Sequence, residues 1–261
     1  MPQLMRGLRG SGVRRVQSGS AARHSILGTP FLPSTVGGLV LWLRANTGTF
    51  QTVGGVAAAA DADPVGEWKD QSGSGNDVSQ ATAGFRPLLK TNIQSGKPVV
   101  RFDGVDDILR SGNITQAQPL TFFLIMKVIV RTDFAQVVSF GGGNGNGFKQ
   151  SNVIDRYALD ANDDSSNVSY TGLDLSTFEL LTILYNGASS ELWFNTVSQG
   201  TGNPGTNGFA GTTLSLARSG PGGSASYSNI DVAELLVYGA VLSAADRASV
   251  EAYLNKHWGV Y

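Results

Sequence analysis

From Gly38 onward the sequence consists of short apolar runs separated by clusters of turn-forming residues. Short runs rich in β-branched and aromatic residues are typical of strands, and their close succession is typical of a sandwich or barrel. Gly, Asn, Asp and Ser fill most connections because they form turns at little steric cost. We therefore predict an all-β domain with strands at 39–43, 98–102, 120–130, 136–140, 156–159, 178–185, 191–195, 213–217 and 230–238.

Composition restricts the class of protein further. The chain has 261 residues, of which 41% are hydrophobic, and this is enough for the core of one large β domain. It has no cysteine, which excludes disulfides and cysteine-based zinc sites. The longest apolar run, at 120–130, is far shorter than the roughly 20 residues of a membrane-spanning helix. We therefore expect no membrane association, and no secretory signal is recognisable.

Residues 1–35 differ from the rest of the chain. They combine Gly, Ser and Arg with little apolar periodicity, and the first acidic residue of the chain is Asp61. This asymmetry predicts an extended basic arm on a sandwich at 36–261, with a disordered tail as the alternative. We expect the arm to bind a protein partner through Arg6, Arg9, Arg14, Arg15, Arg23, Phe31 and Leu32. Nucleic acid is a weaker candidate because the net charge is −1 and no aromatic residues are interleaved with the arginines.

One helix is predicted at the C-terminal end. Ser243 is a good N-cap, and Asp246 follows it at the spacing of a capping box. Gly259 marks the end of the helix, because glycine readily adopts the left-handed conformation that terminates helices. The stripe expected to pack on the sandwich contains Arg247, Val250, Leu254 and Trp258. His257 lies in the last turn, where a positive charge would interact favourably with the helix dipole.

Several segments occur in an order that is informative when they are taken together. They are Gly38-Leu39-Val40-Leu41-Trp42-Leu43-Arg44-Ala45, Trp68-Lys69-Asp70-Gln71-Ser72-Gly73, Gly75-Asn76-Asp77, Arg86-Pro87, the stretch 96–107, Ala233-Glu234-Leu235-Leu236-Val237-Tyr238, Leu242-Ser243 and Tyr253-Leu254-Asn255-Lys256-His257-Trp258-Gly259. This set closely resembles the laminin-G-like, concanavalin-A-like lectin and glucanase superfamily, in the form common in bacterial surface and phage structural proteins. The resemblance covers about 38–261 and implies an antiparallel jelly-roll β-sandwich. It says less about function, because this superfold includes lectins, adhesins, hydrolases and structural modules.

Glycoside hydrolases of the superfamily carry paired acidic residues that alternate on one strand. The nearest pair here is Asp231 and Glu234, whose odd separation predicts opposite faces of a regular strand. Glu179 and Glu191 stand alone, and neither of the two histidines, His24 and His257, suggests a catalytic triad. We therefore expect a protein that is not an enzyme, with a divergent glycoside hydrolase as the remaining enzymatic alternative.

Two acidic clusters are candidates for cation binding. The loop that begins at Asp160 resembles the start of a calcium loop, with Asp160, Asn162 and Asp164 as the candidate ligands. It is not an EF-hand, because Ser165 and Thr171 replace the glycine and the glutamate that such a loop requires. The second cluster, Asp103, Asp106 and Asp107, is expected to be mainly structural. A cofactor is not expected; calcium is possible but not required for folding.

Glycan binding would use an aromatic platform with amides and carboxylates beside it. Trp193 is the best candidate, because alternation along its strand places Glu191 and Asn195 on the same polar face. Tyr170 could join this site from a loop. The competing interpretation is a tryptophan packed under a neighbouring part of the chain.

Taken together, these patterns favour a non-catalytic virion structural protein of phage type, associated with the capsid surface, a fibre or the tail. Its lectin-like domain would be anchored to other virion proteins by the arm, in many copies or as a homo-oligomer. A free or cell-surface adhesin that binds glycans is the alternative, and its localisation would be extracellular.

Overall fold

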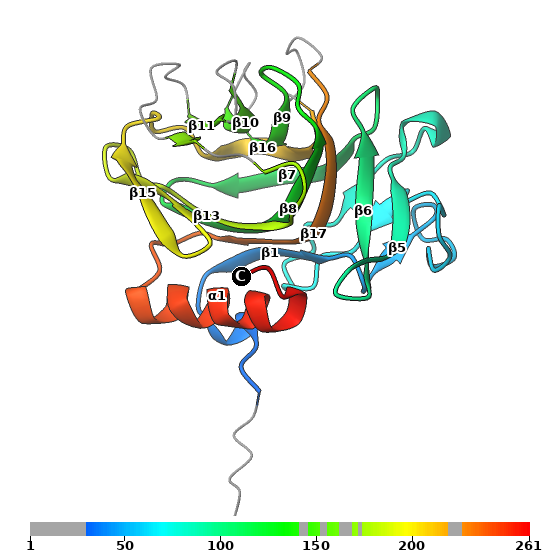
Figure 1. Cartoon of the computed structure of the whole chain (residues 1–261), viewed down its shortest axis with the longest axis horizontal. Coiled ribbons are helices and arrows are strands. Elements are labelled where there is room, and N and C mark those ends of the chain that lie inside the picture. The colour runs from blue at the N-terminus through cyan, green and yellow to red at the C-terminus, as the bar shows by residue number, and fades with distance from the viewer. Residues whose placement is uncertain (1–29, 141–145, 152–155, 162–168, 172–173, 219–225) are drawn as a thin grey trace, which may run out of the picture. The chain divides into compact units, whose positions relative to one another are not determined.

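Two antiparallel β-sheets are stacked face to face in the computed structural model, and a helix covers the outer face of one of them (Figure 1). The model describes residues 30–140, 146–151, 156–161, 169–171, 174–218 and 226–261, and for 156, 169–171, 210 and 211 it describes only the backbone. Phe31–Tyr261 forms one compact unit. The predicted all-β sandwich with a C-terminal helix is confirmed.

The eight-stranded sheet contains most of the apolar strands that the sequence predicts. Its order is β15-β14-β13-β8-β17-β6-β5, and β1 pairs with β17 beside β6. The bounds are β1 Leu39–Arg44, β5 Leu88–Gln94, β6 Lys97–Asp103, β8 Leu120–Val130, β13 Glu179–Tyr185, β14 Ser190–Phe194, β15 Val197–Gly202 and β17 Asn229–Tyr238. Strands β8 and β17 lie at the centre and are buried on both faces, which explains why they read as continuous apolar runs.

The nine-stranded sheet contains shorter and more polar strands. Its order is β12-β11-β10-β9-β16-β7-β4-β3-β2. The bounds are β2 Thr49–Phe50, β3 Glu67–Trp68, β4 Val78–Ser79, β7 Leu109–Gln116, β9 Gln136–Ser139, β10 Gly147–Gln150, β11 Arg156–Asp160, β12 Ser169–Thr171 and β16 Phe209–Leu216. Short 3-10 turns lie at Pro33–Thr35 and Ala83–Phe85.

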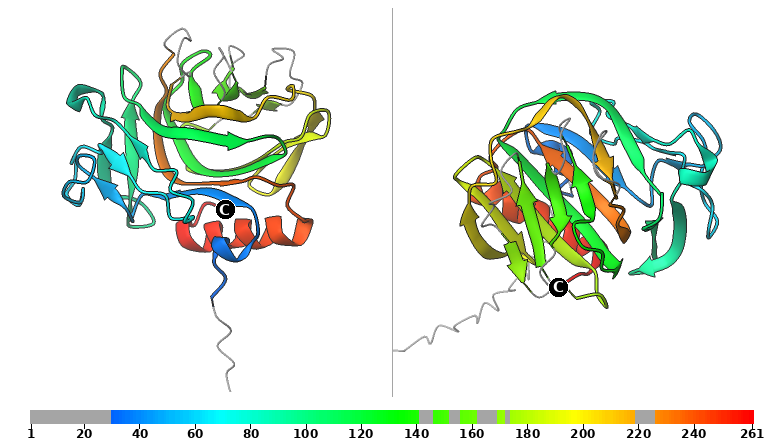
Figure 2. Two further views of the ribbon diagram at one scale, coloured as in Figure 1. Left: turned by 180° about the vertical axis from the view of Figure 1, so that it is seen from behind. Right: turned by 90° about the horizontal axis from the view of Figure 1, so that it is seen from above.

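Two hydrophobic cores hold the layers together. The larger core lies between the sheets and includes a group of mutually packed aromatic rings: Phe122, Phe140, Tyr185 and Phe209. The smaller core lies between the eight-stranded sheet and helix α1, Ala244–Trp258. Figures 1 and 2 agree that α1 runs along the outer face of this sheet.

Helix α1 begins and ends where the sequence predicts. The Ser243 Oγ accepts a hydrogen bond from the Asp246 N–H at 3.1 Å, and Gly259 ends the helix at φ 62°. The Asp246 carboxylate accepts from the Ser243 hydroxyl at 2.7 Å. In a capping box the acid would accept from the N-cap backbone N–H instead. Asp246 differs because its side chain is shorter than that of the usual glutamate. Val250, Leu254 and Trp258 are fully buried, as expected.

The expectation that Asp231 and Glu234 lie on opposite faces is wrong. The pairing of β17 with β8 shifts register between Val232 and Glu234, which marks a β-bulge. Val232 and Leu235 belong to the core between the sheets, whereas Ala233 belongs to the core under α1. A bulge inserts one extra residue into the strand, so two residues that are three apart in sequence can point to the same face. Both carboxylates therefore lie on the face that carries α1, and each is bound by other side chains there.

The start of the compact unit includes residues that the sequence assigns to the arm. The Phe31 ring lies 6.3 Å from the Tyr253 ring and packs against the smaller core. The Tyr238 hydroxyl donates to the Pro33 carbonyl at 3.0 Å. Leu32 is 46% exposed. Residues 1–29, and with them all five arginines predicted to bind a partner, lie outside the described residues.

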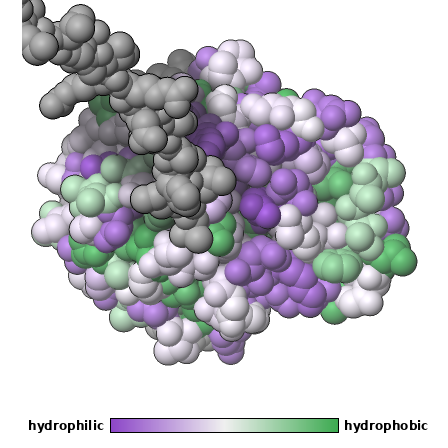
Figure 3. All heavy atoms as spheres, turned by 90° about the horizontal axis from the view of Figure 1, so that it is seen from below, coloured by the Kyte–Doolittle hydropathy of each residue, from purple (hydrophilic) through white to green (hydrophobic). Residues whose placement is uncertain are grey.

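The outer surface on the α1 side has no single dominant character. Figure 3 shows polar and apolar side chains interspersed on this face. Within the described ranges, no helix combines the length and the apolar character that a membrane-spanning helix requires.

Candidate functional site

A groove on the outer face of the eight-stranded sheet, beside the start of α1, contains two of the residues predicted to bind a glycan. Its volume is about 230 Å³, and its lining comes from strands β8, β13 and β14, from the segment that leads into the helix and from the first turn of α1: Thr121, Leu184, Glu191, Trp193, Val241, Leu242, Ala244 and Arg247. We call it the Trp193 groove. Its lining combines an aromatic ring, aliphatic side chains and two opposite charges, which is the mixture found in sites for small polar molecules.

The Trp193 ring is half-buried and lies against α1. The Arg247 guanidinium carbon is 4.3 Å from the centre of the ring, which is the geometry of a cation–π contact. The same guanidinium donates to the Glu251 carboxylate at 3.1 Å, and the Thr182 hydroxyl donates to that carboxylate at 2.9 Å. Arg247 is therefore held in place and its charge is offset by a buried acid. On the side that faces α1, the Trp193 ring is packed against a neighbouring segment, which is the competing interpretation from the sequence.

Within the described ranges, one polar contact of Glu191 is seen. The Ser198 hydroxyl on β15 donates to its Oε1 at 2.5 Å. Glu191 and Trp193 are two residues apart in β14 and face the same side, as alternation predicts. Among the described residues that line the groove, Glu191 is the acidic one. This carboxylate is thus in a position to accept hydrogen bonds from hydroxyl groups of a ligand.

Asn195 does not line the groove with Trp193. It lies in the tight turn between β14 and β15, where Asn195 and Thr196 have φ angles of 44° and 72°. Its side-chain oxygen accepts from the Leu180 N–H at 3.0 Å. The alternation argument fails here because the strand ends at Phe194. Tyr170 lies in β12 of the other sheet, and its side chain is outside the described residues.

The acidic clusters considered for calcium have protein partners. The Asp160 carboxylate is buried and accepts from the Lys149 ammonium at 2.9 Å, while Asn162 and Asp164 lie outside the described residues. In the second cluster, Asp103 accepts from the backbone of the loop that follows it, at 2.8 Å from the Val105 N–H. Burial raises the pKa of Asp107 to about 6. This cluster builds a turn, as expected from the sequence.

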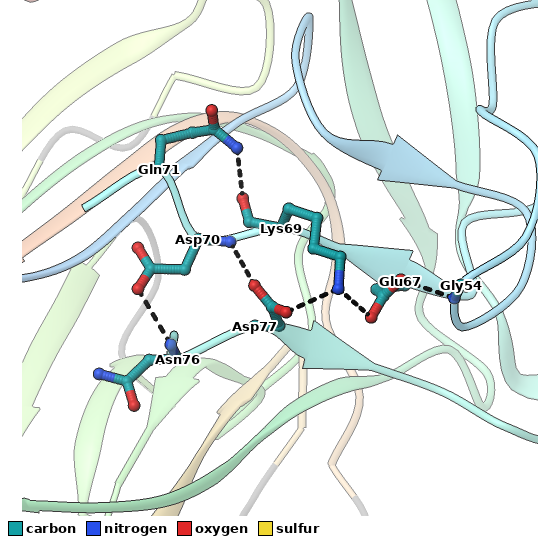
Figure 4. A network of polar contacts seen from close by, with 7 residues as sticks. All are labelled: Gly54, Glu67, Lys69, Asp70, Gln71, Asn76 and Asp77. Carbon is teal, nitrogen blue, oxygen red and sulfur yellow. Dashed lines mark hydrogen bonds and ion pairs between the residues drawn. The ribbon is translucent and has the colours of Figure 1, made fainter. Parts of the chain in front are cut away.

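The segment 67–77, which contributes to the superfamily resemblance, forms a polar network (Figure 4). The Asp70 carboxylate accepts from the backbone N–H groups of Trp42, Ser72 and Asn76 at 2.9, 2.8 and 3.0 Å. The Lys69 ammonium bridges Glu67 and Asp77 at 2.8 Å each. The network fixes the loop between β3 and β4 against β1. The polar groups of this network bond to one another, so we assign the motif a structural role in the fold.

Two further titratable groups lie at the helix–sheet interface. Glu234 is completely buried and accepts from the indole N–H groups of Trp42 and Trp258 at 2.6 and 2.5 Å. Burial raises the pKa of Glu234 to about 7. The prediction that His257 carries a favourable charge is wrong, because burial and the nearby Lys97 and Arg44 lower its pKa to about 4. The imidazole is therefore neutral at pH 7.

Comparison with known proteins gives the fold and no family. No family model matches the chain, and no curated protein sequence matches it. Among solved structures, a sialidase from Trypanosoma rangeli aligns with a TM-score of 0.54 and 13% identity, over 85% of this chain and 33% of that one. The binding domain of botulinum neurotoxin serotype D aligns with a TM-score of 0.55 and 11% identity, over 83% of this chain and 51% of that one. The present chain thus spans a third to a half of these neighbours.

A third neighbour is matched over nearly its whole length. It is domain 4 of AbnA, an extracellular arabinanase from Geobacillus stearothermophilus, in complex with arabinotriose. Its TM-score is 0.52 at 11% identity, over 82% of this chain and 98% of that one. At such low identity the three likenesses establish a shared β-sandwich fold.

Proposed function

We propose that this protein is a non-catalytic saccharide-binding module whose ligand lies in the Trp193 groove. The observation that carries the proposal is the half-buried Trp193 ring in a groove that also contains the Glu191 carboxylate, which has one polar partner among the residues that the structure describes. The neighbours add support, because they include a toxin binding domain and a domain in complex with arabinotriose.

The groove offers complementary chemistry to one sugar residue. A saccharide presents C–H groups on the faces of its ring and hydroxyl groups around its edge. The accessible part of Trp193 and the aliphatic side chains of Leu184 and Val241 offer apolar contacts. Glu191 offers acceptors, and Arg247 offers donors that Glu251 and Trp193 hold in place. A volume of about 230 Å³, smaller than the roughly 300–1,000 Å³ of enclosed drug-sized sites, suits a shallow contact of modest affinity.

We propose a non-catalytic module because the groove presents one available carboxylate within the described part of the chain. Hydrolysis by the usual mechanism needs two carboxyl groups that flank the scissile bond. Glu251, an acid that contacts the groove residue Arg247, is buried and accepts from Arg247 and Thr182. We expect no turnover of any oligosaccharide that binds.

The test is a glycan array followed by calorimetric titration of the whole protein. Trp193→Ala and Glu191→Gln should each weaken binding about tenfold or more, the effect of losing roughly 1.4 kcal/mol of contact energy. Phe85→Ala is the matched control, since it removes a 43% exposed aromatic ring outside the groove. Unchanged affinity in Trp193→Ala, with the protein folded, would refute the site. Product formation that Glu191→Gln abolishes would refute the non-catalytic part.

The finer proposal, that this module belongs to a phage virion and is attached by its arm, is supported by the sequence. The support consists of the superfamily resemblance and of five arginines without an acid in residues 1–35. Deleting residues 1–29 should leave saccharide binding intact and abolish incorporation into particles. Normal incorporation of the shortened protein would contradict attachment by the arm.

A further inference from the structure

Two arginines lie close together on the outer face of the nine-stranded sheet, which is not the sheet that carries the Trp193 groove. Arg110 on β7 is paired with Ser215 on β16. Their neighbours Leu109 and Leu216 face the core between the sheets, so Arg110 and Ser215 face away from it. Arg218 is the second residue after the end of β16, and its guanidinium lies 5.3 Å from the centre of the Tyr227 ring.

Three polar atoms of this cluster have no hydrogen-bond partner among the residues that the structure describes. The Nε atoms of Arg110 and Arg218 and the hydroxyl of Ser215 are buried and make no hydrogen bond. Ser215 is 0% exposed. Buried polar groups are almost always bonded, so three unbonded groups at one place require an explanation.

The positive charge of the cluster is also unbalanced. Neither guanidinium forms an ion pair with a carboxylate in the described part of the chain. The pKa of Arg110 is lowered first by burial and then by the charge of Arg218, which shows that the two cations act on each other. The segment 219–225, which follows Arg218, contains no acidic residue. An external anion is therefore the natural counter-charge.

We propose that Arg110 and Arg218, with the Ser215 hydroxyl, bind the carboxylate or sulfate group of an acidic saccharide. Two half-buried guanidinium groups offer several N–H donors, and the guanidinium fork matches the oxygens of such groups. A bound oxyanion would supply the missing acceptors and offset one of the two positive charges. The oxyanion site lies on the other sheet from the Trp193 groove and does not depend on that groove, whereas the choice of a saccharide as the carrier of the acidic group rests on the proposed function.

A saccharide is favoured over nucleic acid by the distribution of charge. The net charge of the chain is −1, and the cluster contains two cations among the described residues, Arg110 and Arg218. Binding of nucleic acid depends on neutralising many phosphates. Two arginines suit the recognition of a single acidic group.

The test uses sulfate, sialyllactose and a heparin-derived tetrasaccharide as probes of the whole protein. Sulfate should raise the melting temperature more than chloride does at equal ionic strength, because a ligand that binds the folded state stabilises it. Titration should show a preference for the acidic probes over lactose. Arg110→Gln and Arg218→Gln should each weaken acidic binding about tenfold or more and remove the sulfate effect. Lys256→Gln, which removes an exposed cation from α1, is the control and should change neither.

Arg110→Lys keeps the proposal testable if a glutamine variant does not fold, since it retains the charge and loses the fork. It should bind more weakly than the unaltered protein. Equal effects of sulfate and chloride on the unaltered protein, together with no preference for acidic saccharides, would overturn the proposal. So would tighter binding of a DNA duplex than of either saccharide, if Arg110→Lys weakened it.

Discussion

At the scale of single residues, the Glu234 carboxylate joins β1, β17 and α1. Its two oxygens accept from one indole of β1 and one indole of α1. The bonds favour the ionised form and burial opposes it, and burial dominates because the pKa rises to about 7. The attachment of α1 to the sheet therefore depends on this one side chain and on its protonation state.

Replacing Glu234 by Gln should destabilise the fold by about 1–3 kcal/mol, because the amide has one acceptor oxygen and leaves one buried indole N–H without an acceptor. Urea unfolding at pH 7 measures this change. The control is Glu191→Gln, a partly exposed position where a change within about 0.5 kcal/mol is expected. A Glu234→Gln protein as stable as the unaltered one would show that the indole bonds contribute nothing.

Stability should also fall as the pH rises from about 4.5 to about 7. Burial raises the pKa of both Glu179 and Glu234 to about 7, from the ordinary value of 4.5. The folded state therefore binds protons more tightly than the unfolded state, and stability is lost as the pH passes through this window. His257 acts in the opposite direction between about 4 and 6.5, because its pKa is lowered.

Unfolding free energies at pH 5 and pH 7 measure this dependence. The decrease should be smaller in Glu234→Gln, which no longer contributes its proton. A decrease of the same size in both proteins would assign the effect to other groups, and an increase in the unaltered protein would contradict the prediction.

At the scale of elements, the Ser243 cap should contribute to the stability of α1 and therefore of the smaller core. Ser243→Ala removes the acceptor for the Asp246 N–H and should lower the unfolding free energy by about 1 kcal/mol. Ser249→Ala lies in the same helix, on an exposed position, and should be close to neutral. Thermal unfolding of the two variants measures the difference, and equal melting temperatures would contradict the role of the cap.

At the scale of the whole molecule, the described contacts place the boundary of the folded unit before Phe31. Deleting residues 1–29 should leave the melting temperature within about 2 °C of the full chain, since no described contact of the sandwich is lost. Deleting residues 1–35 also removes the Phe31 ring from Tyr253 and the Pro33 carbonyl from Tyr238, and should cost about 1–3 kcal/mol. Equal stability of the two shortened proteins would contradict this boundary.

The sequence by itself determined the fold class and the central elements. The apolar runs of β8 and β17 and the capped stripe of α1 are local patterns, and local patterns survive in any tertiary arrangement. The sequence also identified Trp193 and Glu191, because two residues on one strand face share an environment. The predicted runs missed the strands β2, β3, β4, β5, β7, β10, β12 and β15. These strands are short or carry many polar residues, and strand formation by such segments depends on packing and pairing with their neighbours.

The tertiary structure alone decided where side chains from different elements meet. The bulge that brings Asp231 and Glu234 to one face coincides with the point where β17 changes partner from β6 to β1. The lowered pKa of His257 is caused first by burial and then by the charges of Lys97 and Arg44, which come from other parts of the chain. The opposition of Arg110 and Ser215 depends on the register of β7 against β16. Burial and the interactions between charges depend on residues from distant segments, so no pattern within one segment predicts them.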